Sequence, residues 1–165
     1  MTLRKRVFRT IDIALETDLQ PEVVLDAAHD FSMPRRSLIF NAVQPKYFIV
    51  HALRDGTADV TEGTRAGPIV NWERCDYEWS QPGKVKAIVK DTNVYAIPGS
   101  SWELNATRVD GKTRVRLIWT RAFNRRPKGL LFGFAYRTFG EKLFGTYARE
   151  IIQGLEKLES EAAAP

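Results

Sequence analysis

The first regular pattern in the chain is an alternation of apolar and other residues from Val7 to Leu15. Ile11, Ile13 and Leu15 fall on one side of an extended chain, and the residues between them fall on the other. An alternation with a period of two is typical of a β-strand that buries one face. The pattern therefore predicts that the fold opens with a half-buried strand.

Apolar residues then recur at helical spacing. Pro21 fits the first turn of a helix, and Glu22 suits the positive end of the helix dipole. The apolar positions of this helix are Val24, Leu25, Ala28 and Phe31. Pro34 breaks the pattern, and the ambiguous residues 35–43 favour a second short helix that Pro45 ends. We therefore expect two short helices after the first strand.

Residues 47–123 carry almost entirely strand and turn signals. Short apolar, β-branched and aromatic runs are separated by dipeptides that favour turns, namely Asp55-Gly56, Gly67-Pro68, Pro82-Gly83, Pro98-Gly99 and Asp110-Gly111. This spacing predicts six consecutive antiparallel strands. The clearest hairpin joins residues 102–108 to 113–123, because Asp and Gly tolerate the positive φ angles of a tight turn.

The last predicted element is a long amphipathic helix that starts at Pro127. Its apolar stripe consists of Phe132, Tyr136, Phe139, Leu143, Tyr147, Ile151, Leu155 and Leu158. The order of elements places the helices on one face of the sheet. Because a bent sheet cannot touch a straight helix along its whole length, a gap remains unless large side chains fill it. We expect the aromatic half of the helix, up to Tyr147, to border this cavity and the aliphatic half to close the core.

Several local patterns resemble the START-like superfamily, also called SRPBCC, which includes polyketide cyclases, lipid-transfer domains and birch-type pollen allergens. The matching segments are residues 20–24 (QPEVV), 101–104 (SWEL), 110–115 (DGKTRV) and the terminal helix from Pro127 to Leu158. The resemblance implies an α+β helix-grip fold: a seven-stranded curved antiparallel sheet, two short helices and a long C-terminal helix packed over a hydrophobic cavity. The resemblance implies no particular catalytic residues, because the superfamily has no invariant catalytic set. We expect one START-like domain over residues 1–160 and a disordered tail at residues 161–165.

Chain length, cysteine content and hydropathy indicate the number of domains and the location of the protein. A chain of 165 residues with one cysteine, Cys75, has the size of a single domain and can form no intramolecular disulfide. The basic residues 1–9 run directly into the first strand without the apolar stretch of a signal peptide, so we expect a cytoplasmic protein. The most apolar run, residues 129–136, is far shorter than the roughly 20 residues of a transmembrane segment, and we expect none.

Signatures of metal or cofactor chemistry are scarce. His29 and His51 lack ligand spacing to Cys75, and the chain has no phosphate-cradling loop or dinucleotide fingerprint. We therefore expect no metal and no cofactor. A net charge of +5 is compatible with anionic partners, but it also lies in the range that keeps a small domain in solution.

Strand parity indicates which side chains face the interior. With Val85, Ala87 and Val89 inward, Asp91, Asn93 and Tyr95 continue inward if no bulge changes the phase. The same reasoning turns Glu73 and Tyr77 inward on one strand, and Trp119 and Arg121 on another. Phe134 is a further aromatic that we expect to shape the chamber. The predicted ligand-binding residues are Glu73, Tyr77, Trp79, Asp91, Asn93, Tyr95, Trp102, Trp119, Arg121, Phe132, Tyr136 and Phe139. The alternative for each aromatic is ordinary core packing.

Three functions remain open at this stage. The first is a carrier or sensor that holds a hydrophobic small molecule, favoured by the aromatic interior and the missing catalytic set. The second is a polyketide aromatase/cyclase, for which Glu73, Asp91, Tyr95 and Arg121 are the candidate polar groups. The third is a surface protein whose basic residues bind RNA, the ribosome or an anionic membrane; we rank it last and expect no nucleic-acid partner, because the aromatics are committed inward. Oligomeric state and the question of turnover are left open by the sequence.

Overall fold

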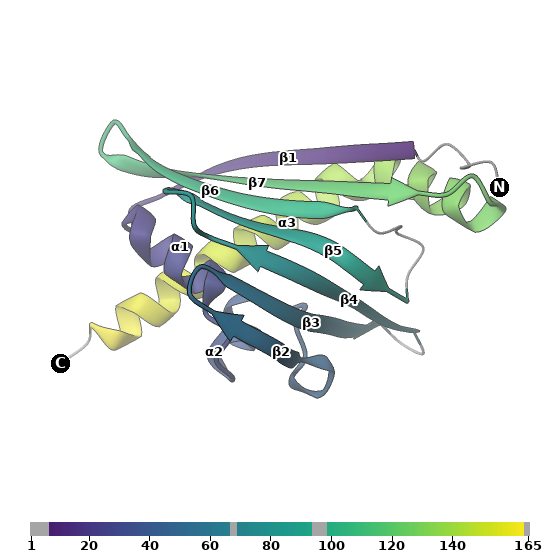
Figure 1. Cartoon of the computed structure of the whole chain (residues 1–165). Helices are drawn as coiled ribbons and strands as arrows, with labels where there is room; N and C mark the ends of the chain where they lie inside the picture. The colour runs from purple at the N-terminus through teal and green to yellow at the C-terminus, as the bar shows by residue number, and fades with distance from the viewer. Residues whose placement is uncertain (1–6, 67–68, 94–98, 164–165) are drawn as a thin grey trace.

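A computed structural model describes residues 7–66, 69–93 and 99–163. A single seven-stranded sheet forms most of the structure, with the strand order β1-β7-β6-β5-β4-β3-β2 and antiparallel pairing throughout (Figure 1). The strands are β1 (Val7–Thr17), β2 (Ile49–Arg54), β3 (Thr57–Ala66), β4 (Ile69–Glu78), β5 (Lys84–Thr92), β6 (Ser101–Val109) and β7 (Lys112–Phe123). The predicted fold class is confirmed.

The strands from β2 to β7 form a meander in sequence order, and β1, the first strand in the chain, pairs with β7 at the end of this meander. The β6–β7 turn has positive φ at both Asp110 (50°) and Gly111 (81°), as the sequence indicated. β1 then pairs with β7 along its whole length, from Val7 opposite Phe123 to Thr17 opposite Thr113. This long-range pairing makes β1 and β2 the two edges of the sheet.

The helices cover one face of the sheet. They are α1 (Pro21–His29), α2 (Arg35–Ile39), the short 3₁₀ helix η1 (Pro45–Tyr47) and α3 (Pro127–Ala162). Figure 1 shows α3 crossing behind the sheet, with α1 and α2 beside its C-terminal half. The helix continues through Ala162, so the first two residues of the segment 161–165 that we expected to be disordered are helical.

The densest part of the core lies where α1 and the second half of α3 meet the sheet. Val24 and Ala28 of α1 are buried, as are Val85 of β5, Leu117 of β7 and Leu155 of α3. α1 packs on β5 and β6, whereas α3 packs mainly on β1. The second half of α3 therefore belongs to the main core of the fold.

Candidate functional site

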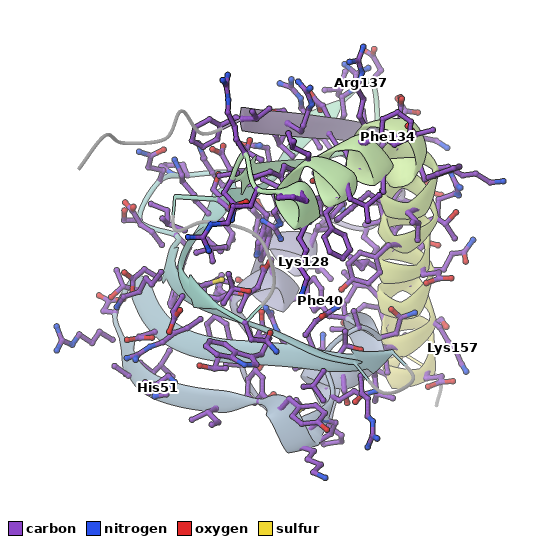
Figure 2. All side chains as sticks on the ribbon, turned by 90° about the vertical axis from the view of Figure 1, so that its right-hand side faces the viewer. Phe40, His51, Lys128, Phe134, Arg137 and Lys157 are labelled. Carbon is purple, nitrogen blue, oxygen red and sulfur yellow. The ribbon has the colours of Figure 1, made fainter. Side chains whose placement is uncertain are left out.

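A cavity of about 550 Å³ lies between the sheet and the first half of α3. Its deeper wall is apolar and includes Trp102, Leu117, Trp119, Phe144 and Ile151. Figure 2 looks into the space between the curved sheet and α3, with Phe40 labelled inside it. Small-molecule sites in proteins have volumes of roughly 300–1,000 Å³ and mostly apolar walls. The cavity therefore has the size and the character of a binding site for a small apolar ligand.

The two halves of α3 differ much as the sequence indicated. Five residues of the first-half stripe line the cavity, namely Phe132, Tyr136, Phe139, Leu143 and Tyr147. In the second half Leu155 is buried in the core, with only 1% of its surface exposed. Ile151 also borders the cavity, one turn after Tyr147, so the lining extends one turn further than we expected.

Replacing Tyr136 by alanine is expected to enlarge the cavity at a modest cost in stability. The ring contacts Phe123 and Phe144, with centroid distances of 5.5 and 5.3 Å, but another side of it faces the cavity. The loss should therefore stay below about 3 kcal/mol, the lower end for a fully packed aromatic. Thermal melting and binding of anilinonaphthalene sulfonate measure both effects. A larger loss of stability with unchanged probe binding would show that Tyr136 is simply a core residue.

An ion pair supplies polar groups on the cavity wall. Glu73 of β4 and Arg121 of β7 both line the cavity, and Arg121 Nη2 lies 3.0 Å from Glu73 Oε2. Arg121 also donates to the carbonyl oxygen of Ser101 at 3.2 Å. Both side chains keep some exposure, 13% for Arg121 and 26% for Glu73. Strand parity predicted these two residues, and the fold brings them together from strands that are not neighbours.

A second charged group, Arg36 of α2, is buried beside the cavity with 1% of its surface exposed. It donates to Glu62 Oε1 at 2.7 Å, to the carbonyl oxygen of Ala28 at 2.8 Å and to the hydroxyl of Tyr77 at 3.2 Å. The Tyr77 hydroxyl in turn donates to the other oxygen of Glu62. The Arg36 guanidinium also lies over the ring of Phe40, 4.2 Å from its centroid. Every polar end of this cluster is thus satisfied within the protein.

Burial and neighbouring charges shift the pKa values of Arg36 and Tyr77 in this cluster, and of Cys75 on the cavity wall. Burial by itself would lower the pKa of Arg36, but the attraction of Glu62 and its hydrogen bond raise that pKa above the usual value. Burial, followed by the negative charge of Glu62, raises the pKa of Tyr77 well above normal, so the phenol stays protonated as a donor. Burial likewise raises the pKa of the cavity-lining thiol of Cys75, which disfavours a nucleophilic thiolate.

The structure gathers seven of the predicted ligand-binding residues around the cavity. They are Glu73, Trp102, Trp119, Arg121, Phe132, Tyr136 and Phe139. Tyr77 and Trp79 do not line it: Tyr77 is buried beneath it in the Arg36 cluster, and Trp79 stacks on His29 at 4.8 Å. Tyr95 lies outside the described residues. Phe134, also predicted to face inward, is 65% exposed on the outer side of α3.

The inward orientation predicted for Asp91 and Asn93 is wrong, and a β-bulge is the reason. Cys75 pairs with Val89 but Arg74 pairs with Asp91, so Lys90 is an extra residue in β5. The phase changes there, and Thr92 takes the inward position opposite Glu73. Asp91 and Asn93 are exposed, and the Asn93 side chain bonds to the backbone of β4 at Val70 and Trp72.

Several cavity residues were not found from the sequence, namely Arg36, Phe40, Glu62, Asn71, Trp72 and Cys75. For Asn71 and Cys75 the signal existed, because they are in phase with Glu73 on β4. Glu62 pairs directly with Glu73 across β3 and β4, a neighbourhood that only the register reveals. Arg36 is the most deeply buried charge in the described part of the chain, which the basic pair Arg35-Arg36 in the sequence does not indicate.

The described residues offer neither a metal cluster nor a membrane-spanning helix. No group of three or more His, Cys, Asp or Glu side chains there could hold a metal ion. No helix in the same ranges has the length and hydropathy needed to cross a membrane.

Comparison with known proteins identifies the fold. No family model and no curated protein sequence matches the chain. Among solved structures, the protein TTHA0849 from Thermus thermophilus has a TM-score of 0.70 at 17% identity, covering 94% of this chain and 100% of that one. A START superfamily protein from Mycobacterium smegmatis has a TM-score of 0.67 at 10% identity, covering 90% and 98%. The Zhui aromatase/cyclase from Streptomyces sp. R1128 has a TM-score of 0.62 at 13% identity, covering 87% and 94%.

The fold class is therefore a START-like, helix-grip fold with an internal cavity. This agrees with the resemblance that the sequence motifs indicated. At such low identities the likeness concerns the fold, and function must be argued from the cavity itself.

Proposed function

We propose that this protein binds a small molecule with an apolar body and one polar group, as a carrier or sensor. The observation that carries the proposal is the cavity of about 550 Å³ between the sheet and the first half of α3. Its aromatic and aliphatic wall suits the apolar body, because burial of apolar surface is the main source of affinity for such ligands. The Glu73–Arg121 pair gives the polar group a donor and an acceptor on the same wall. Structural neighbours of this fold include proteins described as aromatase/cyclases, which is compatible with an enclosed organic ligand.

Filling the cavity tests this proposal. Ala135 lines the cavity from α3, so Ala135→Phe should place a ring inside it and lower the affinity for anilinonaphthalene sulfonate at least about tenfold. Thr138→Phe, on the exposed side of the same helix, is the matched control and should leave the affinity unchanged. Fluorescence titration measures both. Equal affinities for the two variants would contradict binding in this cavity.

Native mass spectrometry of the purified protein addresses the ligand directly. A co-purifying molecule bound by the wild type and by Thr138→Phe, but missing from Ala135→Phe, would support the proposal and give the mass of the ligand. Retention of the same molecule by Ala135→Phe would place its site elsewhere.

A second candidate is a cyclase-type enzyme, and the Glu73–Arg121 pair is what favours it. A carboxylate can take a proton from carbon next to a ketone, and a guanidinium can stabilise the enolate oxygen that forms. Of the other predicted polar groups, Asp91 lies on the exterior and Tyr95 outside the described residues. Glu73→Gln separates the two functions: an enzyme would lose turnover of a bound polyketide while still binding it, whereas a carrier would show no turnover in either form.

The remaining expectations also stand as proposals. A single domain over residues 1–160 is supported by one sheet and one continuous core. A cytoplasmic location rests on the sequence alone, as does the expectation that nucleic acid is not a partner.

A further inference from the structure

The first two turns of α3 carry an apolar patch on the side away from the cavity. Leu130, Leu131 and Phe134 are 54%, 65% and 65% exposed, and none of them lines the cavity. Leu131 and Phe134 are three residues apart and Leu130 and Phe134 are four apart, so the side chains are neighbours on the helix surface. Figure 2 shows Phe134 on the outer side of α3, away from Phe40 in the cavity. We call these three residues the outer patch.

Four cations lie near the outer patch in the sequence, and none of them has an acidic partner in the described residues. Arg125, Arg126, Lys128 and Arg137 are all exposed, and none forms an ion pair with a residue in the described ranges. No Asp or Glu occurs from residue 122 to residue 140. The segment thus combines exposed Leu and Phe side chains with four uncompensated positive charges.

The cavity opens on a different face of the same helix. Phe139 and Leu143 line the cavity and are also 58% and 67% exposed, so the cavity reaches the surface beside them. They follow Phe134 by about one and a half and two and a half turns of α3, so both lie on a face of the helix roughly opposite Phe134. The outer patch and the opening of the cavity therefore lie on different faces of α3.

We propose that the first two turns of α3 dock on an anionic lipid membrane, with the outer patch in the interface and the four cations on the lipid headgroups. Helices of this kind lie in the plane of the membrane, with their apolar side chains at the level of the headgroups and upper acyl chains. Each cation near an anionic surface adds to the affinity by attraction to the headgroups. RNA is the less suitable partner, because two of the three apolar side chains are leucines, which cannot stack on bases.

Sedimentation with lipid vesicles tests the docking independently of ligand binding. The wild type should bind vesicles of equal parts phosphatidylcholine and phosphatidylglycerol, and bind pure phosphatidylcholine much more weakly. Arg125→Gln with Arg126→Gln should lower the partition coefficient by about 25-fold, at about fivefold for each cation. Leu131→Ala with Phe134→Ala should lower it at least about tenfold.

The chain offers matched controls for both pairs. Leu38 and Leu53 are exposed to 56% and 62% outside α3, and Leu38→Ala with Leu53→Ala should leave vesicle binding unchanged. Arg54→Gln with Lys157→Gln removes two exposed cations distant from the outer patch and should lower binding little. All four double variants should still bind anilinonaphthalene sulfonate, because none of the substituted residues lines the cavity.

Three results would overturn the docking proposal. In the first, the wild type fails to bind the anionic vesicles. In the second, Leu131→Ala with Phe134→Ala binds them as well as the control Leu38→Ala with Leu53→Ala. In the third, Arg125→Gln with Arg126→Gln loses binding to a single-stranded RNA oligonucleotide while its vesicle binding is unchanged. Each of these leaves the proposed ligand binding intact if probe binding persists. Loss of probe binding in the wild type, with normal vesicle binding, would instead refute the proposed function and leave the docking in place.

Discussion

Replacing Arg36 by methionine is expected to lower the free energy of unfolding by about 3–5 kcal/mol, because it leaves a charged partner without compensation. Arg36 is almost completely buried, and Glu62 accepts its shortest hydrogen bond, at 2.7 Å. After the substitution Glu62 keeps only the neutral Tyr77 hydroxyl as a partner in this cluster. The carbonyl oxygen of Ala28 loses its guanidinium donor as well. Urea unfolding at neutral pH measures the loss.

Removing both charges is the control for this prediction. Arg36→Met with Glu62→Met should be clearly more stable than Arg36→Met alone, because no unpaired charge remains buried. If the double variant is less stable than Arg36→Met by as much as Glu62→Met alone destabilises the wild type, the two effects add. The two side chains would then act independently, and their ion pair would not be what stabilises the fold.

Leu155→Ala is expected to destabilise the protein by about 2–5 kcal/mol without changing its affinity for anilinonaphthalene sulfonate. The side chain is 1% exposed and lies in the core cluster, away from the cavity lining. Its removal leaves a void that the packed surroundings fill only in part. Thermal melting and probe titration of this variant beside Tyr136→Ala compare the two halves of α3. Similar changes in both measurements for both variants would mean that the helix is one uniform core element.

The layout of the fold could be predicted because its signals are local. The period of two in β1, the Asp110-Gly111 turn and the stripe of α3 each lie within a short stretch of sequence. Such signals fix element type and order, and these suffice to place the helices on one face of the sheet. The element ends were less certain: α2 ends at Ile39, although we expected it to reach residue 43.

The orientation of side chains was predictable only where strands are regular. On β4 and β7 parity placed Glu73 and Arg121 correctly at the cavity. On β5 the extra residue Lys90 reversed the phase, so Asp91 and Asn93 face outward. A bulge arises from how two strands pair, and the sequence of one strand carries no sure sign of it.

The buried charges could not be predicted because their partners are distant in sequence. Arg36 and Glu62 are 26 residues apart and belong to a helix and a strand. Beside Arg35 in the sequence, Arg36 looks like an ordinary surface cation. Its neighbour Arg35 in fact bonds to Glu159 near the surface, at 3.0 Å. Which of two adjacent arginines is buried depends on the packing of α2 against the sheet and α3.

Methyl NMR during a titration with anilinonaphthalene sulfonate tests most directly whether the cavity is the binding site. Ala135, Leu117 and Ile151 line the cavity, whereas Val24 and Leu155 belong to the core beyond it. Binding between the sheet and the first half of α3 predicts large, saturable shifts of the first three methyl sets and small shifts of the other two. Shifts confined to the exposed Leu38 and Leu53, or no saturable shift at the cavity methyls, would contradict ligand binding in this cavity.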